Sequence, residues 1–142
     1  MNFSTNPYRI IFYEKVACSG NAKQKKLLES YGLSFETRDL LKTSWDMDSL
    51  KSFFKDLNKE DIINPFAPQI KNNLLDISKL SKEELIQKMC INPILIKRPL
   101  LEIGEFRLCG FDIQKINKIL NIDICKELSI LTCQSDESCT NV

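Results

Sequence analysis

The stretch from Tyr8 to Gln24 constrains this chain most, because it predicts a strand, a turn and a helix in immediate succession. Apolar, β-branched and aromatic residues dominate positions 8–13, which is the pattern of a buried strand. Turn and helix N-cap residue types follow at positions 19–21. A helical pattern then runs to a stop at Gly32, with Gln24 expected to face water.

Cys18 lies between this strand and the head of this helix. A helix N-terminus presents unbonded N–H groups and the positive end of the helix dipole, and both stabilise a thiolate. Lys15 and Lys23 are close enough in sequence to add to this positive field. The pattern therefore predicts an activated cysteine. The alternative is a small apolar residue that fills a turn, because buried cysteine is common.

Length and charge limit the classes of function. A chain of 142 residues fits one domain with one core. A net charge of +1 argues against a nucleic-acid binder that depends on bulk charge. Residues 121–142 hold four acidic residues and one lysine, so residues 1–120 carry the positive excess. We expect a folded domain over 1–120, then a helix near 123–131 and a flexible acidic tail.

The cysteine content argues for reactive or buried thiols. Positions 1–7 lack the apolar core of a signal peptide, and no apolar run approaches the ~20 residues that cross a bilayer, so we expect a cytoplasmic protein with no membrane partner. Cytosolic cysteines rarely form a disulfide framework. The absence of histidine excludes Cys–His pairs, and the absence of a CxxC spacing argues against a metal site. The cysteines are Cys18, Cys90, Cys109, Cys125, Cys133 and Cys139.

The remaining elements follow from apolar periodicity and turn residues. Ser81 and Glu84 form a capping box, Gly104 opens a hairpin turn, Asp112 caps the last helix, and Thr43 or Ser44 caps an earlier one. Strands are expected at 34–38, 100–103 and 106–109, and helices at 45–57, 61–64, 81–92 and 113–120. The order β-α-β-α-α-β-β-α predicts a four-stranded mixed sheet with helices on both faces. That is the thioredoxin-like α/β order with a helical insert between its halves.

Two segments resemble the glutaredoxin-dependent arsenate reductase family, namely FYEKVACSGNAKQKKLLESYG and NPILIKRPLLEIGEFRLCGFD. The resemblance covers residues 8–120. It is nearest to the branch called nitrogenase-associated proteins, which share EKxxCxxNAxQKxLLExxG, RPLLEIG and CGFD patterns. A second branch binds RNA polymerase and uses a CxxC, whereas position 21 here is Asn. In thioredoxin-like folds the proline at position 99 is commonly cis and lies against the active cysteine.

The resemblance assigns roles to individual residues. It implies that Cys18 is the nucleophile, that Pro99 is the structural cis-proline, and that Arg98 matches one of three arginines that hold the oxyanion. We add Lys15 and Arg107 as candidate thiolate- or oxyanion-stabilising residues. The other two family arginines do not carry over, because residues 39–97 contain none and the third falls on glycine at position 110. Each missing charge-assisted hydrogen bond removes ~1.5–3 kcal/mol of oxyanion stabilisation, and lysine is not equivalent.

The favoured hypothesis is a thiol-redox or regulatory role through Cys18 in nitrogen-fixation metabolism. Cys18 would form a mixed disulfide with glutathione, glutaredoxin or a nitrogenase-related partner, and no other cofactor or metal is expected. Cys133 and Cys139 are candidate resolving thiols, or else unpaired thiols of the tail. An arsenate reductase and a non-catalytic adaptor are the alternatives. Cys109 is expected to pack inward, and pairing with Glu102 or Asp112 is the structural alternative for Arg98.

Overall fold

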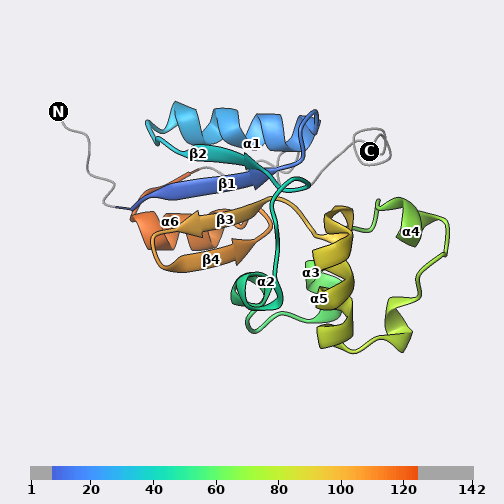
Figure 1. The fold of residues 1–142 in the computed structure, drawn as a ribbon. Helices are drawn as coiled ribbons and strands as arrows, with labels where there is room; N and C mark the ends of the chain where they lie inside the picture. Colours follow the sequence, from blue (N-terminus) through green and yellow to red (C-terminus); the bar gives the residue numbers. More distant parts are fainter. Residues whose placement is uncertain (1–7, 125–142) are drawn as a thin grey trace.

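The computed structural model describes residues 8–124, and these contain one four-stranded sheet in the order β2-β1-β3-β4 (Figure 1). β1 is parallel to β2 and antiparallel to β3, and β3 is antiparallel to β4. This mixed sheet confirms the predicted thioredoxin-like fold. The strands are β1 Ile10–Glu14, β2 Glu36–Asp39, β3 Leu100–Ile103 and β4 Phe106–Cys109.

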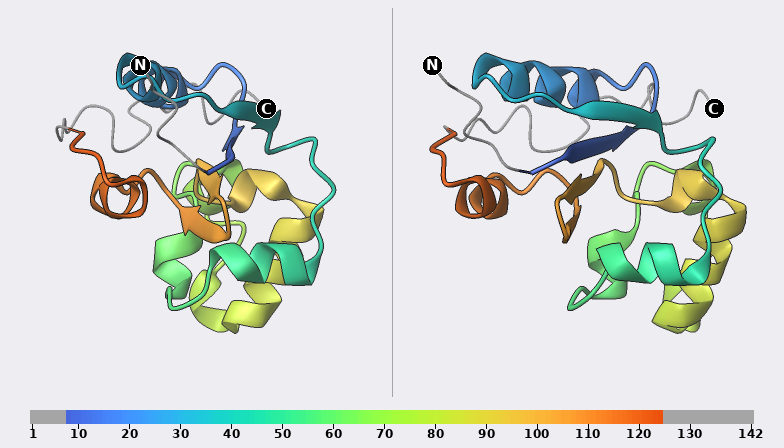
Figure 2. Two further views of the ribbon diagram at one scale, coloured as in Figure 1. Left: turned by 90° about the vertical axis from the view of Figure 1, so that its left-hand side faces the viewer. Right: turned by 60° about the vertical axis from the view of Figure 1, so that its left-hand side comes forward.

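Helices cover both faces of the sheet (Figure 2). α1 (Ser19–Ser30) and α6 (Ile113–Leu120) pack on one face, and the helical insert between β2 and β3 packs on the other. The insert contains α2 Met47–Phe53, α3 Lys59–Ile62, α4 Pro68–Lys71, η2 Ile77–Lys79, α5 Lys82–Ile91 and η3 Pro93–Leu95. The insert therefore leaves the α1 face, where Cys18 begins the helix, to two helices of the core fold.

The sequence of the inner strand β1 is almost continuously apolar because both of its faces are covered. Ile10 and Phe12 pack into the cluster beneath α1 and α6. Ile11 and Tyr13 pack into the second cluster, beneath the insert. Because successive side chains of a strand point to opposite faces, a strand covered on both faces must be apolar at every position.

The N-terminal boundary of α2 differs from the prediction. Asp46, rather than Thr43 or Ser44, is the N-cap, and its carboxylate accepts from the Ser49 N–H at 2.8 Å while the Ser49 hydroxyl accepts from the Asp46 N–H. The helix also ends at residue 53 instead of 57. Asp56 adopts a φ of +66°, which is a left-handed conformation incompatible with continued helix.

The segment around Asn64 differs as well, because α4 forms where a loop was expected. Asn64 is buried and its backbone N–H donates to the Leu95 carbonyl at 2.8 Å, while its side-chain amide donates to the Ile94 carbonyl. This anchoring lets a new helix begin at Pro68, where the missing N–H costs nothing.

The N-cap of α1 is Cys18, so the N-cap predicted at positions 19–21 is wrong and these residues lie inside the helix. The capping and turn predictions for the later elements are confirmed. Ser81 and Glu84 form the capping box of α5, Gly104 turns the hairpin with a φ of +60°, and the Asp112 carboxylate caps α6 through the Lys115 N–H. The predicted helix near 123–131 lies almost entirely outside the described residues.

Candidate functional site

Cys18 is the N-cap residue of α1, with φ −80° and ψ 117°. Its backbone N–H donates to the Lys15 carbonyl at 3.1 Å, and its carbonyl accepts from the Ala22 N–H at 3.0 Å. The residue is only 3% exposed. The thiol thus lies at the positive end of a twelve-residue helix in a buried setting, where the helix dipole acts with little screening.

Arg98 is a charged side chain that the fold brings to this sulfur. Its Nε–H donates to the Sγ atom of Cys18 at 3.5 Å, and the guanidinium side chain is itself buried. The peptide bond to Pro99 is cis. Strand register explains the encounter: Tyr13 pairs with Leu100, so the residues that follow β1 lie beside those that precede β3.

Lys15 is held in the same loop. It is 3% exposed, and its backbone N–H donates to the Oδ1 atom of Asn21 at 3.0 Å. The side-chain amide of Asn21 donates in turn to the Oε1 atom of Gln24 at 2.9 Å. The prediction that Gln24 faces water is wrong, because Asn21 and Gln24 are both buried. The available signal was their spacing of three, which places two amides on one helix face.

The structure does not bring Arg107 to Cys18. Its guanidinium donates to the Gly104 and Phe106 carbonyls at 2.9 and 3.1 Å, and it lies 3.4 Å from the Glu102 carboxylate. Glu102 also accepts from the Tyr13 hydroxyl at 2.7 Å. Arg107 is therefore engaged at the hairpin.

The two remaining arginines form ion pairs with a carboxylate on the edge strand β2. Arg9 and Arg38 both pair with the Glu36 carboxylate, at 2.7 and 2.6 Å. With Arg107 held by Glu102, Arg98 is the one arginine of the chain that the structure places on the Cys18 sulfur.

The other described cysteines lie on the opposite face of the sheet. Cys90 and Cys109 pack against the cluster beneath the insert, which confirms the expected inward packing of Cys109. The Cys109 thiol points to the Lys97 and Asp61 carbonyls at 3.7 and 3.9 Å, and burial raises its pKa to about 12. Burial also raises the pKa of Cys90. Cys133 and Cys139 lie outside the described residues.

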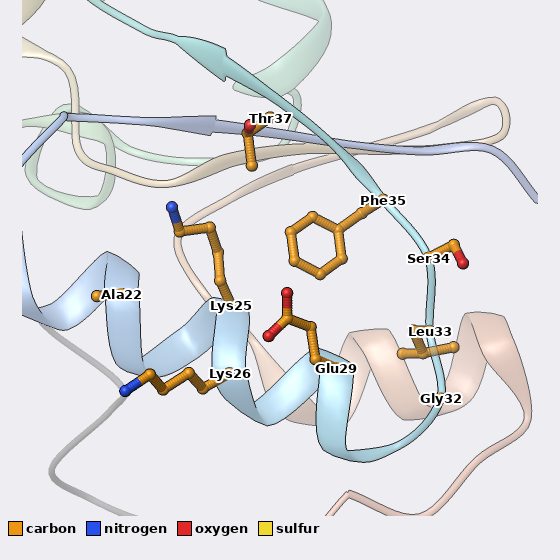
Figure 3. A pocket seen from close by; sticks show the side chains of 9 residues that line it. All are labelled: Ala22, Lys25, Lys26, Glu29, Gly32, Leu33, Ser34, Phe35 and Thr37. Carbon is orange, nitrogen blue, oxygen red and sulfur yellow. The ribbon is translucent and has the colours of Figure 1, made fainter.

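A groove of about 860 Å³ separates α1 from β2, and neither Cys18 nor Arg98 lines it (Figure 3). Lys25, on its wall, pairs with Glu14 at the end of β1. Within residues 8–124 no cluster of side chains could hold a metal ion, and no helix is long and apolar enough to span a bilayer. The groove is lined by Ala22, Lys25, Lys26, Glu29, Gly32, Leu33, Ser34, Phe35 and Thr37.

Comparison with curated proteins finds an uncharacterized relative and transcriptional regulators among the similar proteins. An uncharacterized 15.7 kDa protein in the draG 3′ region of Rhodospirillum rubrum is 32% identical over 126 residues, which are 89% of this chain and 88% of that protein. The global transcriptional regulator Spx 2 of Bacillus cereus is 27% identical over 115 residues, covering 78% of this chain and 86% of that protein.

Solved structures share the fold. A protein from Bacteroides fragilis described as related to the ArsC family superposes with a TM-score of 0.69 at 25% identity, over 78% of this chain and 98% of that one. The arsenate reductase of Vibrio cholerae gives a TM-score of 0.63 at 24% identity, over 83% and 100% of the two chains. The ArsC family matches residues 13–119, and the chain therefore belongs to the ArsC family.

Proposed function

We propose that this protein acts in thiol–disulfide exchange through Cys18, with glutathione or a partner protein's thiol, in the service of nitrogen-fixation metabolism. The observation that carries the proposal is the 3.5 Å contact between the Arg98 Nε–H and the Cys18 sulfur at the head of α1. A guanidinium and a helix N-terminus both favour the thiolate, which is the form that attacks a disulfide.

The exchange needs no reactant other than the Cys18 thiol and a disulfide such as glutathione disulfide. The Cys18 thiolate attacks one sulfur of glutathione disulfide, the S–S bond breaks, and a Cys18–glutathione disulfide forms as one glutathione thiolate leaves. A second thiol reverses the reaction by attacking the glutathione sulfur. Arg98 stabilises the charge on Cys18 before attack and again when the cysteine is the leaving group.

Access to the sulfur is the step that gives selectivity. Cys18 is 3% exposed, whereas Val16, two residues earlier, is 60% exposed. The loop at residues 15–18 therefore presents an apolar side chain to a partner while the sulfur stays covered. A protein partner that packs on Val16 and displaces this loop would therefore reach Cys18 more readily than glutathione disulfide does.

The link to nitrogen fixation rests on sequence. The EKxxCxxNAxQK and RPLLEIG patterns resemble nitrogenase-associated proteins, and the Rhodospirillum rubrum relative is named for its place beside draG. We infer a nitrogenase-related protein as the partner in the mixed disulfide.

Mass spectrometry after incubation with glutathione disulfide tests the proposal. We expect one glutathione on the peptide that contains Cys18, removed by dithiothreitol and absent in Cys18→Ser. Cys109→Ser is the matched control and should keep the adduct, because Cys109 lies on the other face of the sheet. Modification elsewhere with none at Cys18 would refute the proposal.

Partner capture tests the nitrogen-fixation part separately. A disulfide-linked nitrogenase-related protein, trapped from nitrogen-fixing cells by the wild type but not by Cys18→Ser, is the expected result. If Cys18→Ala leaves the cellular function intact, the non-catalytic adaptor replaces the redox protein.

Arsenate reduction has weaker support. The family reaction uses three arginines around the oxyanion, and here Arg9, Arg38 and Arg107 are paired with Glu36 or Glu102. Arsenate turnover with glutathione and glutaredoxin, compared with a Cys18→Ser blank, decides the matter. Turnover above that blank would favour the reductase.

A further inference from the structure

We propose that Asn21 is a positioning residue for Cys18, acting through the main chain of Lys15 and not on the sulfur itself. The inference deepens the proposed function, since it takes Cys18 as the reacting group. Asn21 lies three residues after Cys18, where a CxxC motif has its second cysteine. In this chain the position carries a side-chain amide in place of a second thiol, and we call its hydrogen bond to the Lys15 backbone the amide clamp.

Asn21 and Cys18 hold Lys15 from both sides. The Lys15 N–H donates to the Oδ1 atom of Asn21 at 3.0 Å, and the Lys15 carbonyl accepts from the Cys18 N–H at 3.1 Å. Asn21 is in the first turn of α1, whose later turns pack into the core through Leu28. The clamp thus fixes the loop that carries the thiol to a helix that packs into the core.

Gln24 fixes the orientation of the Asn21 amide. The Asn21 Nδ2 group donates to the Gln24 Oε1 atom at 2.9 Å, and both side chains are buried. If the amide turned over, its NH₂ group would face the Lys15 N–H, and two donors would meet. Because an unsatisfied polar group is costly when buried, the pair is locked with the oxygen toward Lys15.

The loop needs this restraint because its backbone is strained. Ala17 has a φ of +70°, a left-handed conformation that residues with a Cβ atom rarely adopt. Relaxation of Ala17 would turn the next residue, Cys18, away from the Arg98 guanidinium at 3.5 Å. Asn21 therefore holds the thiol in front of Arg98 against the tendency of the loop to relax.

The test compares alkylation of Cys18 by iodoacetamide from pH 5 to pH 10, followed by mass spectrometry of the Cys18 peptide. The variants are Asn21→Ala, which removes the clamp, and Gln24→Ala, which removes only the lock on its orientation. Gln87→Ala, an exposed amide on α5, is the matched control. For Asn21→Ala we expect a rate at pH 7 about fivefold below wild type, with the profile displaced to higher pH, from the loss of charge-assisted hydrogen bonding to the thiolate.

Gln24→Ala should change the alkylation profile in the same direction but by less. In the double variant Asn21→Ala/Gln24→Ala, the change should be smaller than the sum of the two single changes, because both residues act through one chain of hydrogen bonds. If Asn21→Ala does not fold, Gln24→Ala and Asn21→Ser carry the same comparison.

Two results would overturn the inference. An unchanged profile would mean that Asn21 has no influence on the thiol. Faster alkylation at every pH, with the shape of the profile preserved, would mean that Asn21 only keeps Cys18 covered. Alkylation needs no glutathione, so the inference can hold even if the proposed exchange with glutathione fails.

Discussion

The Nε–H of Arg98 donates to the Sγ atom of Cys18 at 3.5 Å, although 80 positions separate the two residues. The contact depends on the antiparallel pairing of β1 with β3, which places the end of one strand beside the start of the other. Both residues are buried. A charge that is shielded from water acts more strongly on its neighbour, so the Arg98 guanidinium acts strongly on this sulfur.

Replacing Arg98 by Gln should slow alkylation of Cys18. Loss of one hydrogen bond from a charged donor, worth at least ~1.5 kcal/mol, corresponds to a rate at pH 7 lower by about tenfold. Arg98→Lys should fall between the two, because lysine keeps the charge but not the planar donor geometry. Arg9→Gln, at an exposed arginine that precedes β1 and pairs with Glu36, is the control and should react like wild type. Equal rates in Arg98→Gln and wild type would remove Arg98 from the site.

The Cys109 thiol should make the protein less stable at alkaline pH. Burial raises its pKa from 9.0 to about 12 in the folded state, so between these values the folded protein binds more protons than the unfolded chain. The free energy of unfolding must then fall as pH rises through this window, by at most ~1.4 kcal/mol per pH unit. Burial and the hydrogen bond to Glu102 also raise the pKa of Tyr13, which contributes with the same sign.

Urea denaturation at pH 8, 9 and 10 measures this slope. Cys109→Ala should be less stable than wild type at pH 8 because it loses packing, yet its stability should decline less steeply with pH. Tyr13 leaves part of the decline in place. Parallel declines in the two proteins would show that Cys109 ionises as readily in the folded state as in the unfolded chain.

Glycine at position 17 should relieve strain in the loop before Cys18. A residue with a Cβ atom at a φ of +70° costs roughly 1–2 kcal/mol, and glycine gives back part of this gain through the greater freedom of the unfolded chain. The net change expected for Ala17→Gly is a rise of up to about 1 kcal/mol in the free energy of unfolding. Ala22→Gly, at an exposed position of α1, should lose about 1 kcal/mol in the same urea titration. A loss of the same size in both variants would contradict strain at Ala17.

The sequence predicts the sheet better than the helix boundaries. The predicted bounds of β3 and β4 match the observed ones, because two short apolar runs that flank a glycine turn fix a hairpin locally. The start of α2 could not be fixed, since several neighbouring residues are acceptable N-caps. The reciprocal hydrogen bonds of Asp46 and Ser49 decide it.

The sequence also predicts some residues of the candidate site and misses others. Cys18 follows from the strand–turn–helix pattern and Arg98 from the family resemblance, and strand pairing brings the two together. Proximity in sequence suggested Arg107, but its side chain shares the insert-facing side of the sheet with Glu102, its partner in the β3–β4 register. The sequence does not predict Asn21 and Gln24 as residues of the site, because amide side chains on a helix usually face water. Their burial depends on the loop that folds over them.

Position 110, where the family has its third arginine, should not accept one in this chain. Gly110 has a φ of +88°, and a Cβ atom there would lie 3.1 Å from the Cε atom of Lys97. Its N–H also donates to the Pro99 carbonyl at 2.8 Å, beside Arg98.

Gly110→Arg should therefore lower the free energy of unfolding by roughly 1–2 kcal/mol through backbone strain. It should also slow Cys18 alkylation by disturbing the Pro99 loop, and it should not create arsenate turnover. Gly32→Arg is the matched control, because Gly32 has a similar φ of +74° but open space around its Cβ position. That variant should lose similar stability and leave Cys18 alkylation unchanged. Arsenate turnover in Gly110→Arg would instead mean that the loop can rearrange to build the family's oxyanion site, and that a single substitution separates this chain from the reductases.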